Sequence, residues 1–243
     1  MFFVLPGLSM YFQMFLLLAL LPAIVLMVYI YRLDPIDKEP DGLLWTLIIQ
    51  GVYAALVSSL LEGVGMNVLG LYTGLDPQSA SFEIVSDFLF VGVIEEGSKY
   101  WLMSRKTWNN LAFGCRFDGV VYAVFTSLGF AAAENLMYGF MYGPGVLFAR
   151  AFMAIPAHMG FAVLFGLFYG QAKGMSVRGQ KVGAGVLIAV GYVLSVLLHG
   201  LYDSAAMVGT NDSDAHFLLV VVVIYLVNFV LTRQAARNDR RFA

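Results

Sequence analysis

The hydrophobic positions of the chain fall into long runs that polar residues rarely interrupt. A helix needs about 20 mostly apolar residues to cross a bilayer. Seven runs reach about this length, at residues 10–31, 43–62, 82–103, 118–138, 146–170, 182–208 and 216–232. The pattern leaves open whether the second helix continues through residues 63–72. It predicts an all-α fold, a polytopic membrane helix bundle of about seven transmembrane helices.

The composition favours lipid as the solvent of this bundle. Hydrophobic residues make up 60% of the 243 residues and charged residues 12%, whereas soluble proteins carry about 25% charged residues. The connections are short, so we expect one domain over residues 1–243, with its motifs in a core at about residues 82–208. No basic arm suited to nucleic acid is present. The single cysteine, Cys115, allows neither an internal disulfide nor a cysteine-based zinc site.

Basic residues lie on alternate connections, and this predicts the orientation. Cytoplasmic loops are enriched in Lys and Arg. Of the 14 basic residues, Lys99 and Arg150 lie inside predicted helices. The others fall after the first, third and fifth runs and in the C-terminal tail. We therefore expect the N-terminus outside and the C-terminus in the cytoplasm.

Ionisable residues interrupt the apolar runs at few points, and a charge inside a bilayer indicates function by default. The third run carries Glu95, Glu96 and Lys99 in the sequence VIEEGSKYW. Glu95 precedes Lys99 by four residues, the better-oriented spacing for a helical ion pair, so we assign Glu95 to Lys99. Glu96 points about 100° away, and we expect it to be the weakly paired carboxylate and the general base. A structural ion pair explains Glu95 and Lys99 equally well but leaves Glu96 unexplained.

Three further runs carry polar groups of the same kind. The fourth holds Glu134, the fifth holds His158 just after Pro156, and the sixth holds His199 and Asp203. His199 and Asp203 are four residues apart on one helix face, where a carboxylate can orient an imidazole that binds a metal or a proton. Pro156 should bend the fifth helix near the histidine. A lone intramembrane histidine is otherwise more often a hydrogen-bonded core residue than a ligand.

These groups lie at similar depths in different helices. At a rise of about 1.5 Å per residue, Glu95 and His158 fall near the middle of the membrane, and His199, Glu134 and Asp203 fall between that level and the outer surface. Scattered structural pairs have no reason to share a level. We therefore expect one water-filled cavity that opens toward the outside.

The motifs resemble those of the PrsW family of intramembrane proteases. The matching patterns are EExxK (Glu95, Glu96, Lys99), FxxxE (Phe130, Glu134) and HxxxD (His199, Asp203). The stretches DKEPDGLLW at 37–45, FDGVVYA at 117–123 and the run at 158–170 are similar as well, so the resemblance covers about residues 30–205. It implies a catalytic set made of Glu95, Glu96, Lys99, Glu134, His158, His199 and Asp203.

The resemblance implies a peptidase that cleaves a single-span membrane protein. The family's named example cuts an anti-sigma factor on the extracytoplasmic side and so starts a stress response. The implied location is the cytoplasmic membrane of a bacterium or archaeon. The lipid bilayer is then the surrounding medium, and no nucleic-acid partner is expected.

Two mechanisms remain open at this stage. In a metal-dependent one, His158, His199 and a carboxylate such as Glu134 bind a divalent ion, for example zinc, which activates a water. In a metal-free one, Glu95 or Glu96 takes the proton from the water, and a histidine stabilises the developing oxyanion. The chain has no HExxH pair, so a metal would be assembled from separate helices. The residues alone slightly favour the metal-free chemistry. The resemblance to a family that is often described as metalloprotease-like favours the metal. The related CAAX-prenyl-protease and bacteriocin-processing superfamily instead resembles a system in which a glutamate activates the water.

Two other classes of protein fit part of the pattern. One is a membrane scaffold of the same fold, as in the presenilin-associated scaffold subunit that the superfamily resembles. The other is a proton-coupled transporter, because acidic and histidine residues also form proton relays. Transporters of this size often contain an inverted repeat, and the sequence shows none that we can recognise.

Overall fold

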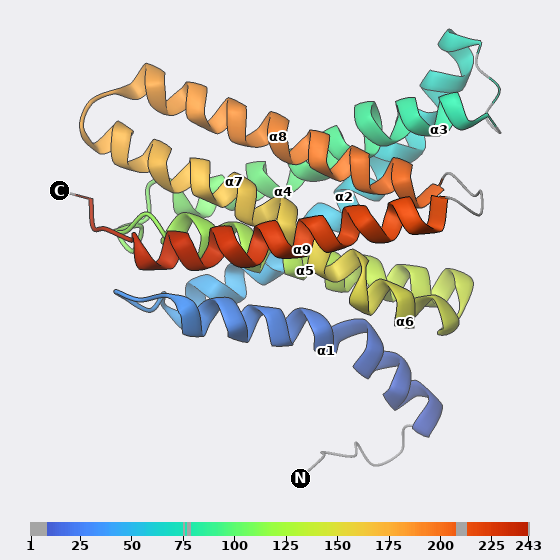
Figure 1. The fold of residues 1–243 in the computed structure, drawn as a ribbon, viewed down its shortest axis with the longest axis horizontal. Coiled ribbons are helices and arrows are strands. Elements are labelled where there is room, and N and C mark those ends of the chain that lie inside the picture. The colour runs from blue at the N-terminus through green and yellow to red at the C-terminus, as the bar shows by residue number, and fades with distance from the viewer. Residues whose placement is uncertain (1–8, 75, 77–78, 208–212, 243) are drawn as a thin grey trace.

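The computed structural model describes residues 9–74, 76, 79–207 and 213–242. These residues form helices and one isolated β-bridge. The elements are α1 Met10–Leu33, α2 Asp41–Thr73, α3 Ala80–Ser86, the π-helix η1 Asp87–Gly92, α4 Val93–Thr107, α5 Asp118–Tyr142, α6 Gly145–Phe152, α7 Ala154–Val177, α8 Lys181–Met207 and α9 Ser213–Arg237. Their long helices run roughly along one axis of the molecule (Figure 1). The predicted all-α bundle is thus confirmed.

Six helical segments of the described chain are long and apolar enough to cross a bilayer. The predicted run at 82–103 is not among them, because it folds as three consecutive pieces, α3, η1 and α4. Charged groups also make α4 much less apolar than the other long helices. The described bundle therefore contains six candidate spans, one of which joins α6 and α7, and one broken segment in place of the seventh predicted helix.

Helix α2 settles the boundary that the sequence left open. It runs without a break through the predicted extension and ends at Thr73, where Gly74 takes the left-handed conformation with φ 64°. Its 33 residues span about 50 Å at 1.5 Å per residue, compared with about 30 Å for the hydrocarbon core. Part of α2 therefore lies beyond the hydrocarbon or is accommodated by tilt.

Helix α5 is the centre of the bundle, and it packs against α1, α2, α4, α6 and α7. Every residue from Asp118 to Ala131 is buried. The spacing of Gly166 and Gly170 in α7 predicts a small-residue packing face, and α5 meets that face. A Cβ added at Gly119 would lie 2.7 Å from the Gly166 carbonyl oxygen and 2.6 Å from the Gly170 nitrogen, so only glycine allows this approach.

Two prolines shape the helices on this side of the bundle. The segment with Pro156 is interrupted at Met153, between α6 and α7. Pro156 lacks the N–H that would bond the carbonyl of Phe152, and its ring crowds that carbonyl. The predicted bend near the histidine is therefore present. Pro22 lies inside α1, which bends away from the bundle toward its N-terminal end (Figure 1).

The connections that carry basic residues meet at the end of the bundle where the C-terminus lies (Figure 1). Arg241 pairs with Asp37 at 2.6 Å, and the backbone of Phe242 donates to the Gly114 carbonyl at 2.8 Å. Lys173 donates to the carbonyl of Trp108 on the same end. The strict alternation of connections thus appears in the fold, and the side of the membrane that each end faces stays a prediction. Within the predicted last connection, residues 209–212 lie outside the described residues.

Candidate active site

The glutamate-bearing segment enters the site through irregular turns. The π-helix η1 leads directly into α4, and such turns occur frequently at functional sites. Gly92 ends η1 and lies against α8, since a Cβ there would be 3.1 Å from the Val196 carbonyl oxygen. This close approach places α8, with His199, beside the first turn of α4.

Lys99 lies at the centre of the site and is fully buried. Its ammonium nitrogen lies 3.0 Å from Glu95 Oε2, 2.8 Å from Glu96 Oε1 and 3.2 Å from Nδ1 of His158. A lysine ammonium has three N–H donors, and these contacts use all three. The same nitrogen lies 3.9 Å from the centre of the Phe130 ring. Lys99 therefore links α4 to α7 as a fixed positive charge.

The prediction that Glu96 is the weakly paired carboxylate is wrong. Glu96 is fully buried, and its Oε1 contacts both Lys99 and Nδ1 of His199, each at 2.8 Å. Glu95 also pairs with Lys99, but it lines a cavity that Glu96 does not reach. The spacing rule compares residues within one helix, so it does not predict a partner on another helix such as α8. The carboxylate open to the cavity is therefore Glu95.

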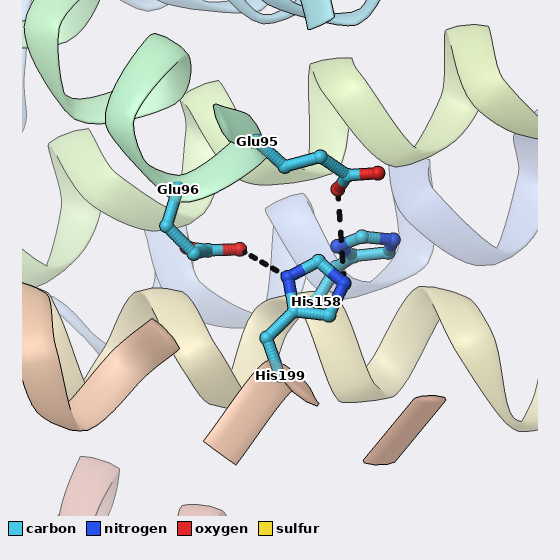
Figure 2. Close-up of side chains that lie close together, drawn as sticks. All are labelled: Glu95, Glu96, His158 and His199. Carbon is cyan, nitrogen blue, oxygen red and sulfur yellow. Dashed lines mark hydrogen bonds and ion pairs between the residues drawn. The ribbon is translucent and has the colours of Figure 1, made fainter. Parts of the chain in front are cut away.

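His199 lies between carboxylates on both sides. Nδ1 contacts Glu96, and Nε2 lies 3.1 Å from Asp203 Oδ2 and 3.8 Å from Glu95 Oε2. Figure 2 shows the imidazole reaching from α8 toward the two glutamates of α4. Its other face stacks on Phe161, with ring centres 4.6 Å apart. The predicted pairing of His199 with Asp203 is confirmed, and the ring is fixed in orientation.

His158 is held in a similar way from α5. Its Nε2 lies 3.0 Å from Glu134 Oε2, while Nδ1 faces Lys99. Because the ammonium must donate to Nδ1, the proton of a neutral ring lies on Nε2 and is donated to Glu134. Arg150 donates to the same Glu134 oxygen at 2.6 Å and to Asn135 Oδ1 at 2.8 Å. Glu134 thus orients His158 and is itself neutralised by Arg150.

Four side chains bring possible ligand atoms within 4.8 Å of one another, namely Glu95, Glu96, His158 and His199 (Figure 2). All four are buried. We call them the carboxylate–histidine group. Glu134, which the sequence offered as a metal ligand, is not a member of this group, because it lies on the far side of His158.

A cavity of about 450 Å³ lies over the carboxylate–histidine group. Glu95, Glu134, His158, His199 and Asp203 all line it. Its walls come from α2, α3, η1, α4, α5 and α8 and from the segment of α6 and α7. These elements converge away from the C-terminal end, so the cavity belongs to the end that the sequence predicts to be outside.

The structure therefore brings together all seven residues of the predicted catalytic set. Several polar residues of the cavity wall were left unassigned by the sequence, among them Ser58, Glu62, Asp87 and Arg150. Arg150 was recognised only as a charge inside a helix. A charge inside an apolar run was the available signal for Glu62 too, but the predicted helix ended at this residue. Ser58 carries no such signal.

Comparison with known proteins gives one consistent result. A family model described as PrsW family intramembrane metalloprotease matches residues 39–231. A protein named Protease PrsW from Clostridioides difficile (strain 630) is 28% identical over 218 residues, which cover 87% of each chain. One of the same name from Bacillus subtilis (strain 168) is 28% identical over 184 residues, 75% of this chain and 78% of the relative. No solved structure matches the chain.

Proposed function

Because the chain belongs to the PrsW family of intramembrane metalloproteases, we propose that its carboxylate–histidine group hydrolyses a peptide bond of a single-span membrane protein. The chain is accordingly a peptidase and a multi-pass protein of the bacterial cell membrane. The cavity supports this substrate class, because it is lined by several helices at one end of the bundle and has room for part of an unwound chain segment. An anti-sigma factor cut near its extracytoplasmic side is a substrate of this kind.

A divalent metal fits the donor set. Two imidazoles and two carboxylates approach within 4.8 Å, and nitrogen and oxygen ligands of this kind suit zinc. Glu96 Oε2 is also buried without a hydrogen-bond partner in the described part of the chain, and such an atom is costly to leave unsatisfied. His158, His199 and the two glutamates would hold the ion. When bound, it supplies a Lewis acid that makes a water nucleophilic.

The chain's own groups support proton transfer at the same place. Glu95 is the buried carboxylate that faces the cavity, so we assign it to take a proton from the attacking water. The water oxygen bonds to the carbonyl carbon, the C–N bond breaks, and the proton goes to the leaving amine. His199 lines the same cavity. The N–H of its Nε2, which faces Asp203, would turn to the developing oxyanion. Lys99 fixes both glutamates relative to His158.

The observation that carries this proposal is that Glu95 is both a member of the carboxylate–histidine group and a wall residue of the cavity. The test is incubation of the purified protein in detergent with a panel of single-span membrane proteins, scored for cleavage. Cleavage by wild type that disappears in folded Glu95→Gln supports the proposal. Absence of cleavage of every substrate by folded wild type, or normal cleavage by Glu95→Gln, contradicts it.

A chelator arm of the same experiment distinguishes the two mechanisms. If a metal is required, the chelator should abolish cleavage, and added zinc should restore it. If Glu95 acts without a metal, cleavage should be unchanged by the chelator. A metal analysis of the purified protein, with His199→Ala as the matched control, gives a readout that does not depend on activity.

A further inference from the structure

Two polar side chains of α2 face the cavity without a partner. Ser58 is 1% exposed, and its Oγ has no hydrogen-bond partner. Glu62 has a buried Oε1 that also has none. The residues are four apart, so they lie one turn apart on the same face of the helix. Both line the cavity that contains Glu95 and His199.

The charges around this cavity are mostly negative. The carboxylates that line it are Glu62, Asp87, Glu95, Glu134 and Asp203. The nearest cations are already engaged, because Arg150 pairs with Glu134 and Lys99 uses all three donors on other groups. No Lys or Arg nitrogen of the described residues lies within 4.0 Å of Glu62. The Glu62 carboxylate therefore has no salt-bridge partner among the described residues.

A half-buried carboxylate with one buried, unpaired oxygen, beside a buried hydroxyl that is also unpaired, indicates that a partner is missing. Leaving such a group unsatisfied is unfavourable, and inside a membrane protein an ionisable residue marks a functional position by default. Ser58 adds a second acceptor oxygen on the same face. The carboxylate–histidine group does not include Glu62, so the metal chemistry does not account for it.

We propose that Ser58 and Glu62 form a subsite that binds a basic side chain of the substrate, a lysine or an arginine. This inference rests on the proposed function and adds a determinant of specificity to it. An ammonium or guanidinium group offers several N–H donors, which the Glu62 carboxylate and the Ser58 hydroxyl can accept together. A neutral amide would gain little from the surrounding negative charge. The subsite would fix which peptide bond of the substrate segment lies against Glu95.

The probes are model peptides with one membrane-spanning segment of alanine and leucine. Each peptide carries a single lysine, glutamine or glutamate, and its position is moved residue by residue along the end of the segment predicted to lie outside. With wild type, one position should favour lysine over glutamine by at least about tenfold in kcat/KM, the effect of one charged hydrogen bond. Glu62→Gln should reduce this ratio to near one, chiefly through a higher KM for the lysine peptide. Ser58→Ala should reduce the ratio less. Ser59→Ala, at the neighbouring wall residue, is the matched control and should keep the preference.

Binding of the same peptides to the Glu95→Gln variant separates this inference from the proposed function. Lysine-selective binding that is lost in Glu62→Gln/Glu95→Gln supports the subsite even if wild type cleaves none of the peptides. Cleavage by wild type without a lysine preference overturns the subsite and leaves the protease assignment intact. A preference that survives in folded Glu62→Gln overturns it as well.

Discussion

Two sets of buried carboxylates lie in this bundle, and they are neutralised by different means. In the carboxylate–histidine group, Glu95 and Glu96 share one buried ammonium and a histidine from another helix. At the C-terminal end, a second set comprises the buried Asp34, Glu39 and Asp118 and the half-buried Asp239, which we call the tail-end acidic group. No Lys or Arg nitrogen of the described residues lies within 4.0 Å of its carboxylates.

Neutral donors, and not cations, contact three members of the tail-end acidic group. Asp118 accepts from the backbone N–H groups of Gly114 and Cys115, at 2.9 and 2.7 Å. Asp239 accepts from a backbone N–H and Glu39 from the hydroxyl of Tyr122, each at 2.8 Å. Burial, followed by the charge of Asp118, raises the pKa of Glu39 to about 8.

Burial also raises the pKa of Asp34 to about 6. A carboxyl group that keeps its proton near neutral pH serves packing, because it avoids the free energy of burying a charge. Glu95 and Glu96 instead have a buried counter-charge in Lys99 and lie beside two histidines, an arrangement that can bind a metal. The difference separates a structural set from a chemical one in the same molecule.

The largest expected effect comes from removing Lys99, the cation that contacts the carboxylate–histidine group. Lys99→Met leaves two buried glutamates without their shared partner, and breaking a buried ion pair costs about 3–5 kcal/mol. Thermal melting in detergent should show a strongly destabilised protein. Lys106→Met, at an exposed position of the same helix, is the control and should melt like wild type. Equal melting of both variants would contradict the central role of Lys99.

The second prediction compares one glutamate from each set. Glu95→Gln keeps the shape of the side chain but removes the base, so cleavage per folded molecule should fall by at least about 100-fold. Glu39→Gln, in the tail-end acidic group, should change the cleavage rate by less than about twofold at neutral pH, because Glu39 is largely protonated there. A large loss of activity in folded Glu39→Gln would show that the two sets do not divide in this way.

The sequence predicts the helical bundle and the members of the site better than it predicts their pairing. Apolar runs directly reflect the free energy of placing a helix in lipid, and ionisable residues are rare enough in such runs that Glu95, His158 and His199 stand out. Which glutamate is free depends on a contact between α4 and α8, which helical spacing does not describe. The break of the third run into three pieces and the pairing of Arg150 with Glu134 also depend on packing between helices.

The third prediction concerns the pH dependence of stability. The ordinary pKa of a glutamate is 4.5 and that of folded Glu39 is about 8, so the folded state binds its proton more tightly. The resulting stabilisation is complete below pH 4.5, falls by about 1.4 kcal/mol per pH unit as the unfolded carboxyl ionises, and is lost once the pH passes about 8. Glu39→Gln cannot ionise. Its melting temperature should therefore rise relative to wild type between pH 5 and pH 8.

The control for this measurement is Asp41→Asn, an exposed position that follows the same connection. It should track wild type across the pH range. Asp34 has a folded pKa of about 6. The melting temperature of Glu39→Gln should therefore still change with pH below about pH 6, but less steeply than that of wild type. A melting difference between Glu39→Gln and wild type that does not change with pH would contradict a protonated Glu39.

The smallest effect tests whether the C-terminal tail closes the tail-end acidic group. Cys115 is 1% exposed, forms a β-bridge with Arg241, and burial raises the pKa of its thiol to about 12. Because the thiolate is the reactive form, a maleimide should not label the folded wild type at neutral pH. Removal of residues 239–243 takes away the bridge and should make Cys115 reactive. Arg241→Ala keeps the backbone of the bridge and loses only the ion pair with Asp37, so its thiol should stay protected. If Arg241→Ala is labelled as fast as the truncated chain, the ion pair and not the backbone bridge holds the tail in place. If the folded wild type itself is labelled, the tail does not protect Cys115.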